Sequence, residues 1–279
     1  MKILVTGGTG FIGSRLVKKL IDEGHEVVIL DKSSKNADER AKFIQGDILD
    51  QEDIERAMKG CSAVFHLAAI TQIGADEDKT YKVNFIGSKN IFNQAKKQKA
   101  RIIFTSTASV YGNTPAPHRE SAECSPISFY GKTKLNAEKL IPDAFIVRLF
   151  NVYGPGGNGV LNLFAENIPK YEDIIIFGTG TQTRDFVHVD DVVNVLMKGL
   201  EFEGIYNVGT GRETSLLSLA DMIFSITKNK PNIKFGMPKE GDIRRSVANI
   251  DHLKKYGWEP KISLEDGLKM LLHDKLPKN

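Results

Sequence analysis

Short, largely apolar runs alternate with amphipathic stretches through the first half of the chain. The apolar runs predict buried strands at 3–5, 27–30, 42–45, 63–67, 101–105 and 144–148. Apolar residues at helical spacing predict helices between them, at 11–23, 50–58, 81–97 and 130–140. Apolar strands that alternate with helices form a parallel sheet covered on both faces. The pattern therefore predicts an α/β fold built on a doubly wound parallel sheet.

The alternation loosens beyond about residue 150. A glycine-rich loop at 154–159 precedes predicted strands at 174–177 and 205–208 and a predicted helix at 190–200. The C-terminal part mixes helices with proline and glycine turns. We expect one domain over residues 1–150, with returns to it from about 184–209. A smaller α/β lobe is expected over 151–183 and 210–279.

Three glycines indicate nucleotide chemistry. Gly7, Gly10 and Gly13 follow the first predicted strand and open the first predicted helix. In such a loop the first glycine permits a tight turn, the second lets amides approach a pyrophosphate, and the third lets the helix pack closely on the strand. Free amides at the helix N-terminus then bind the phosphates. The strand–loop–helix context predicts a Rossmann-type dinucleotide site.

Charged residues at the ends of two further strands refine this prediction. Asp31 ends the second strand, at the spacing where a carboxylate binds both hydroxyls of the adenosine ribose. A carboxylate there repels a 2′-phosphate and favours NAD over NADP, although the neighbouring Lys32 would attract such a phosphate. Asp47 would bind the adenine amino group or remain a surface acid. His66 is expected to be a strand-end residue with no part in catalysis.

Tyr130 and Lys134 lie four residues apart and therefore on one face of a predicted helix. A tyrosine with an unperturbed pKa of about 10 is a poor base, and a nearby ammonium lowers that pKa. A surface pair without a function is the alternative. The hydroxyl-rich segment TSTASVYG at 105–112 ends another strand, where open α/β sheets bind ligands. Together these features predict that Tyr130 removes a hydroxyl proton while hydride passes to NAD.

The composition argues against several other classes of function. The 279 residues carry a formal net charge of +3, so no basic field indicates nucleic acid or a membrane surface as partner. Cys61 and Cys124 form neither a metal-binding pattern nor a disulfide framework, which suits a reducing cytoplasm. No apolar run approaches the ~18 residues of a membrane span. We expect a cytoplasmic, soluble protein that binds no metal.

Several segments together resemble a known family. They are TGGTGFIG at 6–13, GDI at 46–48, HLAA at 66–69, VN at 83–84, STASVYG at 106–112, YGKTK at 130–134, RLFNVYGP at 148–155, QTRDFVHVDD at 182–191 and GDIRRS at 241–246. In this order they resemble the extended short-chain dehydrogenase/reductases, within the NAD-dependent epimerase/dehydratase group, and most closely its UDP-glucose 4-epimerase branch. The resemblance covers nearly the whole chain.

The resemblance implies a role for each matching residue. Thr107 would bond the sugar 4-oxygen, Tyr130 would act as base and Lys134 would tune it. Contacts with NAD are implied for Gly7, Gly10, Phe11, Ile12, Gly13, Asp31, Lys32, Asp47, Ile48, Leu67, Ala68, Ala69, Asn84, Thr105, Tyr130, Lys134 and Phe150. Contacts with a nucleotide sugar, most simply a UDP-hexose, are implied for Ser106, Thr107, Tyr130, Asn151, Val160, Phe177, Arg184, Asp242 and Ser246. A domain-bridging salt bridge to an acid is the alternative for Arg184.

The residues after Thr107 favour one reaction of this family. Dehydratases and decarboxylases usually carry acidic residues there, which eliminate water or act on a carboxylate. This chain has Ala108 and Ser109, neither of which titrates usefully. We therefore expect a 4-epimerase that works through a transient 4-keto sugar. A dehydratase or 4-ketoreductase of the same family, a non-catalytic NAD-binding module and an NADP-dependent reductase of small carbonyls are the alternatives.

Two departures from the family pattern bear on the substrate. Ser246 stands where a bulky residue restricts the site to small hexoses, so N-acetylated sugars are expected to fit. Lys239 stands where an arginine is common, and leaves a single ammonium to meet phosphate. Members of the family also pair through helices equivalent to those around 83–97 and 130–140, which implies a homodimer.

Overall fold

The computed structural model describes all residues except 73, 231, 239–241 and 274–279. Two compact units emerge. The first comprises Met1–Gly112, Glu123–Arg148 and Val193–Tyr206, and the second comprises Asn113–Ala122, Leu149–Val192 and Asn207–Asn279.

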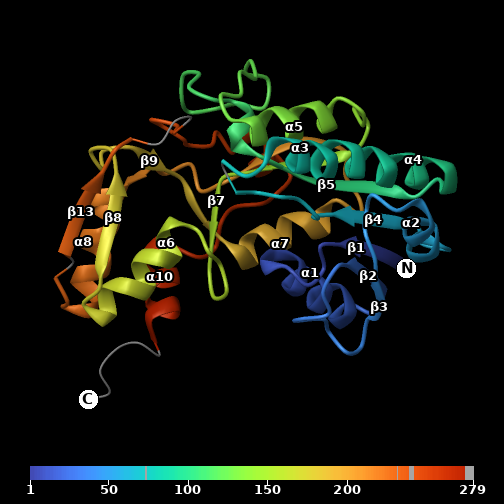
Figure 1. The fold of residues 1–279 in the computed structure, drawn as a ribbon, viewed down its shortest axis with the longest axis horizontal. Coiled ribbons are helices and arrows are strands. Elements are labelled where there is room, and N and C mark those ends of the chain that lie inside the picture. Colours follow the sequence, from blue (N-terminus) through green and yellow to red (C-terminus); the bar gives the residue numbers. More distant parts are fainter. Residues whose placement is uncertain (73, 231, 239–241, 274–279) are drawn as a thin grey trace. The chain divides into compact units, whose positions relative to one another are not determined.

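A seven-stranded sheet forms the centre of the first unit (Figure 1). Its strands are β1 (Lys2–Thr6), β2 (Glu26–Asp31), β3 (Lys42–Gln45), β4 (Ala63–His66), β5 (Arg101–Thr107), β6 (Phe145–Leu149) and β11 (Gly204–Val208). The order β11-β6-β5-β4-β1-β2-β3 contains the arrangement typical of doubly wound folds. Parallel pairing joins β3 to β2, β2 to β1, β1 to β4 and β4 to β5. The predicted Rossmann-type fold is confirmed.

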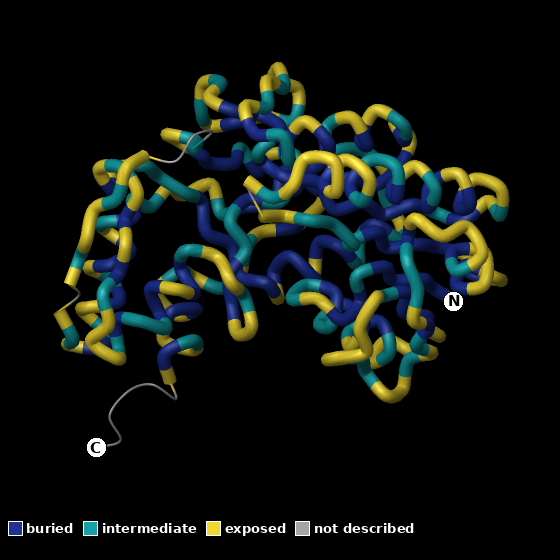
Figure 2. The backbone as a smooth tube through the Cα atoms, in the orientation of Figure 1, coloured by how far each residue is buried: buried dark blue, intermediate teal, exposed yellow. Residues whose placement is uncertain are grey.

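Helices cover both faces of this sheet, as its apolar strands require. Helices α2 (Gln51–Met58), α4 (Ser88–Gln98) and α5 (Phe129–Glu138) pack on one face, in a cluster that includes Ile54, Phe92 and Ala137. Helix α1 (Phe11–Asp22) packs on the other face and buries Leu16, Val17 and Leu20. Figure 2 shows that the strands are buried along most of their length.

The helix predicted at 81–97 is wrong in its start and in its regularity. Helix α3 begins at Glu77 and ends at Tyr81, because the Asp76 side chain caps it by accepting the Lys79 amide at 2.6 Å. A π-helical stretch, η1 (Lys82–Gly87), then leads into α4. Apolar spacing cannot reveal either feature, since the cap is polar and the widened turn keeps the chain helical. Such turns often mark functional sites.

Three two-stranded sheets and several helices form the second unit. Strand β7 (Asn151–Tyr153) pairs with β10 (Phe186–His188), β8 (Asp173–Phe177) with β13 (Asn232–Gly236), and β9 (Thr183–Arg184) with β12 (Thr214–Ser215). Helices α6 (Val160–Asn167), α8 (Leu216–Thr227) and α10 (Leu264–Leu272) enclose a second core. Helices η3 (Ile168–Lys170) and α9 (Asp251–Lys255) also belong to this unit. The short helix η2 (Ala108–Val110) belongs to the first unit, and α7 (Val189–Lys198) is divided between the two units after Val192.

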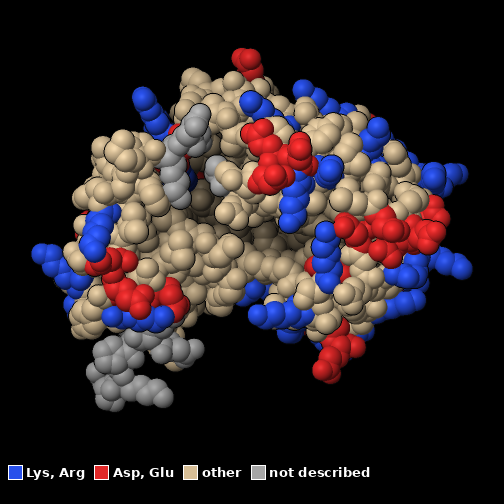
Figure 3. All heavy atoms as spheres, in the orientation of Figure 1, with Lys and Arg blue, Asp and Glu red and all other residues tan. Residues whose placement is uncertain are grey.

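Basic and acidic side chains are interspersed on the face drawn in Figure 3, without a continuous basic strip among the described residues. This distribution agrees with the small net charge of +3. None of the helices in the described part of the chain is long and apolar enough to cross a membrane.

Candidate active site

The glycine loop between β1 and α1 has the geometry that the three glycines predict. Gly7 has φ +71°, a left-handed conformation that side chains other than glycine rarely adopt. A Cβ on Gly13 would lie 2.1 Å from the Gly7 carbonyl oxygen, so only glycine lets α1 approach the loop. Helix α1 begins after Gly10 with no side-chain cap. Its first amides are thus available to a phosphate.

The Asp31 carboxylate is bound to this loop. It accepts the Thr9 hydroxyl at 2.7 Å, the Thr9 amide at 3.2 Å and the Lys32 amide at 2.7 Å. Because each carboxylate oxygen can accept more than one bond, ribose hydroxyls can still bind. The Lys32 ammonium instead pairs with Asp47 at 2.8 Å. Burial acts to raise the pKa of Asp47, but the Lys32 bond and charge lower it overall. Lys32 is thereby directed away from any 2′-phosphate.

A pocket of about 740 Å³ opens beside the loop, entirely within the first unit. Its lining includes the expected cofactor residues Gly7, Gly10, Asp31, Lys32, Asp47, Ile48, Leu67, Ala68 and Ala69. The sequence analysis missed Thr9, Leu30, Gly46, Ile70, Gln72, Ala75, Asp76, Lys79 and Val83. Thr9 lies between two motif glycines, which was a usable signal. The segment that contains Gln72 and Lys79 carries no motif of its own.

Several residues expected to contact the cofactor are not among those that line this pocket. Asn84 is fully buried and binds both the amide and the carbonyl of Ile70 at 2.8 Å. It therefore supports the pocket wall. The Thr105 hydroxyl donates to the His66 carbonyl at 3.2 Å and links β5 to β4. Phe150 is buried in the second unit, with its ring 6.3 Å from that of His118. Phe11 and Ile12 occupy the first turn of α1.

Tyr130 and Lys134 share one face of α5, and Tyr130 bonds the Thr107 side chain at the end of β5. Burial raises the pKa of Tyr130 to about 12, and the Thr107 bond opposes that rise. Burial lowers the pKa of Lys134 to about 7, against the charge of Glu138. The Lys134 ammonium lies 4.1 Å from the centre of the Phe104 ring. Lys134 was expected to lower the pKa of Tyr130, but burial has the largest effect on that pKa and raises it.

The Ser106 hydroxyl, expected to face the substrate, donates instead to the Glu138 carboxylate. Ser106 is 2 % exposed. His66, at the end of β4, bonds Thr6 at 2.7 Å and Ser88 at 2.8 Å through its two ring nitrogens. Burial holds its pKa well below the usual value. The expectation that His66 is a structural residue agrees with these contacts.

The residues expected to hold a diphosphate and sugar lie in the second unit. Arg184 forms an ion pair with Asp242 and donates to the carbonyls of Thr183 at 2.8 Å and Ile243 at 2.6 Å. Both residues belong to the second unit and to the expected site, so this ion pair is not the domain-bridging salt bridge considered as the alternative. Burial lowers the pKa of Arg184, and Asp242 opposes this effect. Ser246 is buried.

The other expected substrate residues are spread along this unit. Asn151 opens β7, and its amide donates to the Asp185 carbonyl at 2.9 Å. Val160 opens α6 and packs on the second core. Phe177 ends β8 and is 36 % exposed. Lys239 and Gly241 lie outside the described residues.

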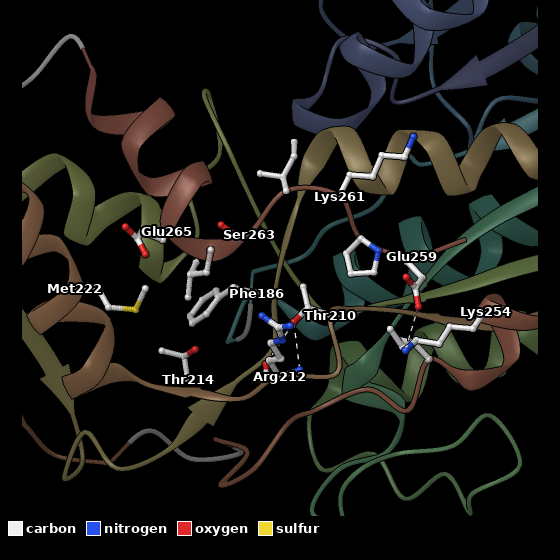
Figure 4. Close-up of a pocket in the computed structure, with 14 residues that line it drawn as sticks. Phe186, Thr210, Arg212, Thr214, Met222, Lys254, Glu259, Lys261, Ser263 and Glu265 are labelled. Carbon is white, nitrogen blue, oxygen red and sulfur yellow. Dashed lines mark hydrogen bonds and ion pairs between the residues drawn. The ribbon is translucent and has the colours of Figure 1, made fainter. Parts of the chain in front are cut away.

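A crevice of about 500 Å³ also lies within the second unit (Figure 4). It is lined by Phe186, Met222, Arg212 and eleven other residues, and it contains an ion pair between Lys254 and Glu259 at 3.3 Å. None of its lining residues was expected in a site. The residues that carry recognisable chemistry therefore lie elsewhere.

The doubly wound sheet, the tight glycine loop and the strand-end Asp31 define a dinucleotide-binding enzyme of the Rossmann class. The chain belongs to the NAD dependent epimerase/dehydratase family, whose model matches residues 3–209. It is an enzyme of this family, and NAD is its cofactor. The residues of the glycine loop and pocket fit that cofactor by geometry.

Relatives and solved structures cover nearly the whole chain. A putative UDP-glucose 4-epimerase of Methanocaldococcus jannaschii is 34% identical over 97% of both chains. UDP-glucuronic acid decarboxylase 1 of Arabidopsis thaliana is 32% identical over 98% of this chain and 69% of its own. The UDP-glucose 4-epimerase of Thermotoga maritima, solved with UDP-glucose, superimposes with a TM-score of 0.94 at 35% identity, covering 98% of both chains. The Thermus thermophilus UDP-glucose 4-epimerase, solved with NAD, gives 0.93 at 29%, covering 99% of both.

Proposed function

We propose that this chain is an NAD-dependent nucleotide-sugar 4-epimerase that interconverts UDP-hexoses through a transient 4-keto sugar. The observation that carries the proposal is the position of the Tyr130 phenol beside Thr107, in the same unit as the pocket beside the glycine loop. A phenol held at the end of a parallel strand stands where such sheets bind ligands. The epimerase relatives support the same reaction.

Tyr130 is proposed as the base that removes the proton of the sugar 4-hydroxyl, and Thr107 as the residue that bonds the same oxygen. The pKa of about 12 for Tyr130 means that the phenol needs added positive charge to act near neutral pH. Lys134 on the same helix face is proposed to supply part of it. NAD, when bound, supplies the hydride acceptor and donor and a positive ring. Net redox change is zero, so bound NAD is not consumed.

The residues after Thr107 distinguish epimerisation from the decarboxylase chemistry of other relatives. Ala108 and Ser109 form η2, and the Ser109 amide donates to the Thr107 hydroxyl oxygen at 3.1 Å. Neither side chain supplies the acid or base that elimination of water requires. This absence supports oxidation and reduction at one carbon over a dehydratase or decarboxylase.

Asn151, Arg184 and Asp242 are proposed to hold the nucleotide diphosphate, with Val160 and Phe177 against the nucleoside. The Arg184 guanidinium donates hydrogen bonds to Asp242 and to two backbone carbonyls. Its remaining N–H groups are available to phosphate oxygens. Fixing the diphosphate while holding the hexose loosely would let the keto sugar present either face. Tyr130 would then return the proton it had removed.

Incubation with UDP-galactose tests the proposal. The purified protein, with no NAD added, is expected to form UDP-glucose, and chromatography of the released sugar measures it. Tyr130→Phe is expected to lose at least about 100-fold in kcat while it keeps the fold. Full activity in this variant, or formation of a 4-keto-6-deoxy sugar nucleotide, would contradict the assignment.

We also propose that N-acetylated sugars are accepted, because Ser246 is small. Ser246→Tyr is expected to reduce kcat/KM for UDP-N-acetylglucosamine at least tenfold more than for UDP-glucose. The matched variant Ser246→Ala, which keeps the space, is expected to leave the ratio of the two kcat/KM values within twofold. Equal losses for both sugars in Ser246→Tyr would contradict the idea.

A cytoplasmic homodimer is the proposed state of the protein. The surface of η1, α4 and α5 would pair with a second copy. Tyr81 directly precedes η1, its ring lies 5.2 Å from that of Phe85, and it is 40 % exposed. Multi-angle light scattering is expected to give about twice the chain mass of 30.9 kDa. Tyr81→Glu would then reduce the dimer fraction, whereas a monomeric wild type would rule the pairing out.

A further inference from the structure

A buried polar cluster lies behind the Tyr130/Lys134 pair. We define it as Ser106, Tyr111, Glu138 and Arg148, none more than 4 % exposed and all within the first unit. The Arg148 guanidinium donates to the Glu138 carboxylate at 2.7 and 3.2 Å and to the Tyr111 hydroxyl at 3.0 Å. Ser106 donates to the same carboxylate. The proposed mechanism assigns no role to Glu138 or Arg148.

A contribution to folding stability does not by itself explain why this cluster contains a buried ion pair. Bringing a carboxylate and a guanidinium out of water costs several kcal/mol per ion, and apolar residues of similar volume often stabilise as well or better. The ion pair is nevertheless completely satisfied, with both carboxylate oxygens bound and the Arg148 fork lying 5.0 Å from the centre of the Tyr111 ring. Because burying the Glu138–Arg148 ion pair costs this desolvation free energy, we infer that its charge has a function beyond stability.

Helical spacing connects Glu138 to the proposed catalytic pair. Tyr130, Lys134 and Glu138 follow one another at intervals of four residues in α5 and therefore form one stripe. Lys134 is 1 % exposed, and the Glu138 charge opposes the effect of that burial on its amine. Without the carboxylate, the Lys134 amine would lose its proton at a lower pH and with it the charge that the phenol needs.

Groups on the neighbouring strands do not replace that carboxylate. His66 of β4 stacks on Phe104 at 5.7 Å, and its pKa, held well below the usual value, makes it neutral. Arg148 of β6 is cationic and pairs with Glu138 at 2.7 Å, so it cannot supply the negative charge that stabilises the ammonium. Glu138 thus sets the balance of charge around Lys134.

The second contact of Glu138 reaches the end of β5. Ser106 directly precedes Thr107, whose hydroxyl bonds Tyr130. Glu138 therefore links two elements. It belongs to α5, which carries Tyr130 and Lys134, and it bonds β5, which carries Thr107.

We propose that Glu138 is a positioning residue, which keeps Lys134 charged and fixes the β5 end that carries Thr107. The proposal rests on the proposed roles of Tyr130 and Lys134. Arg148 holds the Glu138 carboxylate in place. Glu138 itself touches neither substrate nor cofactor.

A direct titration of Lys134 tests the proposal whatever the substrate is. In protein labelled with ¹⁵N-lysine, the side-chain signal that disappears in Lys134→Met reports Lys134, and its pKa is read from a pH series. Glu138→Gln keeps the shape of the side chain and is expected to lower this pKa by at least about one unit. Glu55→Gln makes the same change at an exposed residue of α2 and is expected to leave it unchanged.

The kinetic counterpart is the pH profile of epimerisation. Loss of the Lys134 proton should set its basic limb, so Glu138→Gln is expected to move that limb to lower pH and to reduce kcat at pH 8 at least tenfold, with KM little changed. Glu138→Asp, which keeps the charge, is expected to restore the limb in part. A merely structural role would lower activity equally at every pH.

A double variant guards against simple misfolding. Glu138→Met with Arg148→Met removes both buried charges and should fold, yet it is expected to keep the lowered Lys134 pKa. A wild-type pKa in both Glu138→Gln and the folded double variant would overturn the proposal. A lowered pKa in a protein that does not epimerise UDP-hexoses would refute the proposed function and leave the charge coupling standing.

Discussion

At the residue scale, single carboxylates make structural contacts that the sequence pattern does not predict. Asp31 is the residue proposed to favour NAD, and its bonds to Thr9 also hold the glycine loop against the end of β2. Spacing alone predicts roles for Asp31, Tyr130 and Lys134. It could not reveal that Ser106 faces Glu138, because that contact joins residues on different elements.

Lys134 gives a prediction for stability against pH. Its pKa of about 7 in the folded protein lies below the ordinary lysine value of 10.5, so between these values the unfolded chain binds the extra proton. The contribution of Lys134 to stability is therefore full above pH 10.5 and is lost as the pH falls towards 7. Relative to Lys134→Met, the free energy of unfolding of the wild type should rise with pH from 7 to 9, by at most about 1.4 kcal/mol per unit.

Urea denaturation at several pH values measures this difference. Lys132→Met, on the same helix but exposed, serves as the control and should track the wild type. Parallel curves for the wild type and Lys134→Met would show that the amine is not perturbed by burial.

Most strands and several helices at the element scale were predictable, because apolar periodicity reports burial directly. Strand β3 occupies the predicted residues 42–45, and β1, β2 and α1 differ from the prediction only at their ends. The π-helical η1 was not predictable, since Asn84 and Gly87 are placed by long-range contacts. Asn84 binds Ile70, and a Cβ on Gly87 would meet Ile48 at 2.6 Å.

The two short strands β9 and β10 depend on a buried carboxylate between them. Asp185 accepts the amides of Thr210 at 2.7 Å, Gly211 at 3.0 Å and Ala248 at 3.0 Å. Asp185→Ala leaves these amides without their acceptor and is expected to reduce the free energy of unfolding by about 3 kcal/mol. Asp221→Ala, on the exposed side of α8, should change it by less than about 0.5 kcal/mol. Equal free energies of unfolding for Asp185→Ala and Asp221→Ala in chemical denaturation would contradict this account.

At the scale of the whole molecule, the residues proposed to bind NAD and those proposed to bind the nucleotide sugar belong to different units. The pocket proposed for NAD belongs to the first unit, and Arg184, Asp242 and Ser246 belong to the second. The sequence suggested a division near residue 150, but it gave no indication that Asn113–Ala122 joins the second unit. That segment is placed by distant partners, such as the bond from the His118 amide to the Val247 carbonyl at 2.9 Å.

Hydrogen exchange can locate the two ligands. NAD is expected to slow exchange in peptides that cover 5–13, 29–32 and 66–70, whereas UDP is expected to slow it in peptides that cover 182–186 and 242–248. The experiment compares each ligand alone by mass spectrometry, with the Arg184→Met variant as the control for UDP. Protection of only the first group of peptides by UDP would contradict the proposed division.

The central claim is that a sugar carbon is oxidised and reduced again within one turnover. UDP-galactose carrying deuterium at C4 tests it most directly, with mass spectrometry of the UDP-glucose formed in ordinary water. The account predicts that deuterium stays at C4 of the product, also when unlabelled NADH is present in solution. Loss of the deuterium to water or to the free cofactor would contradict it.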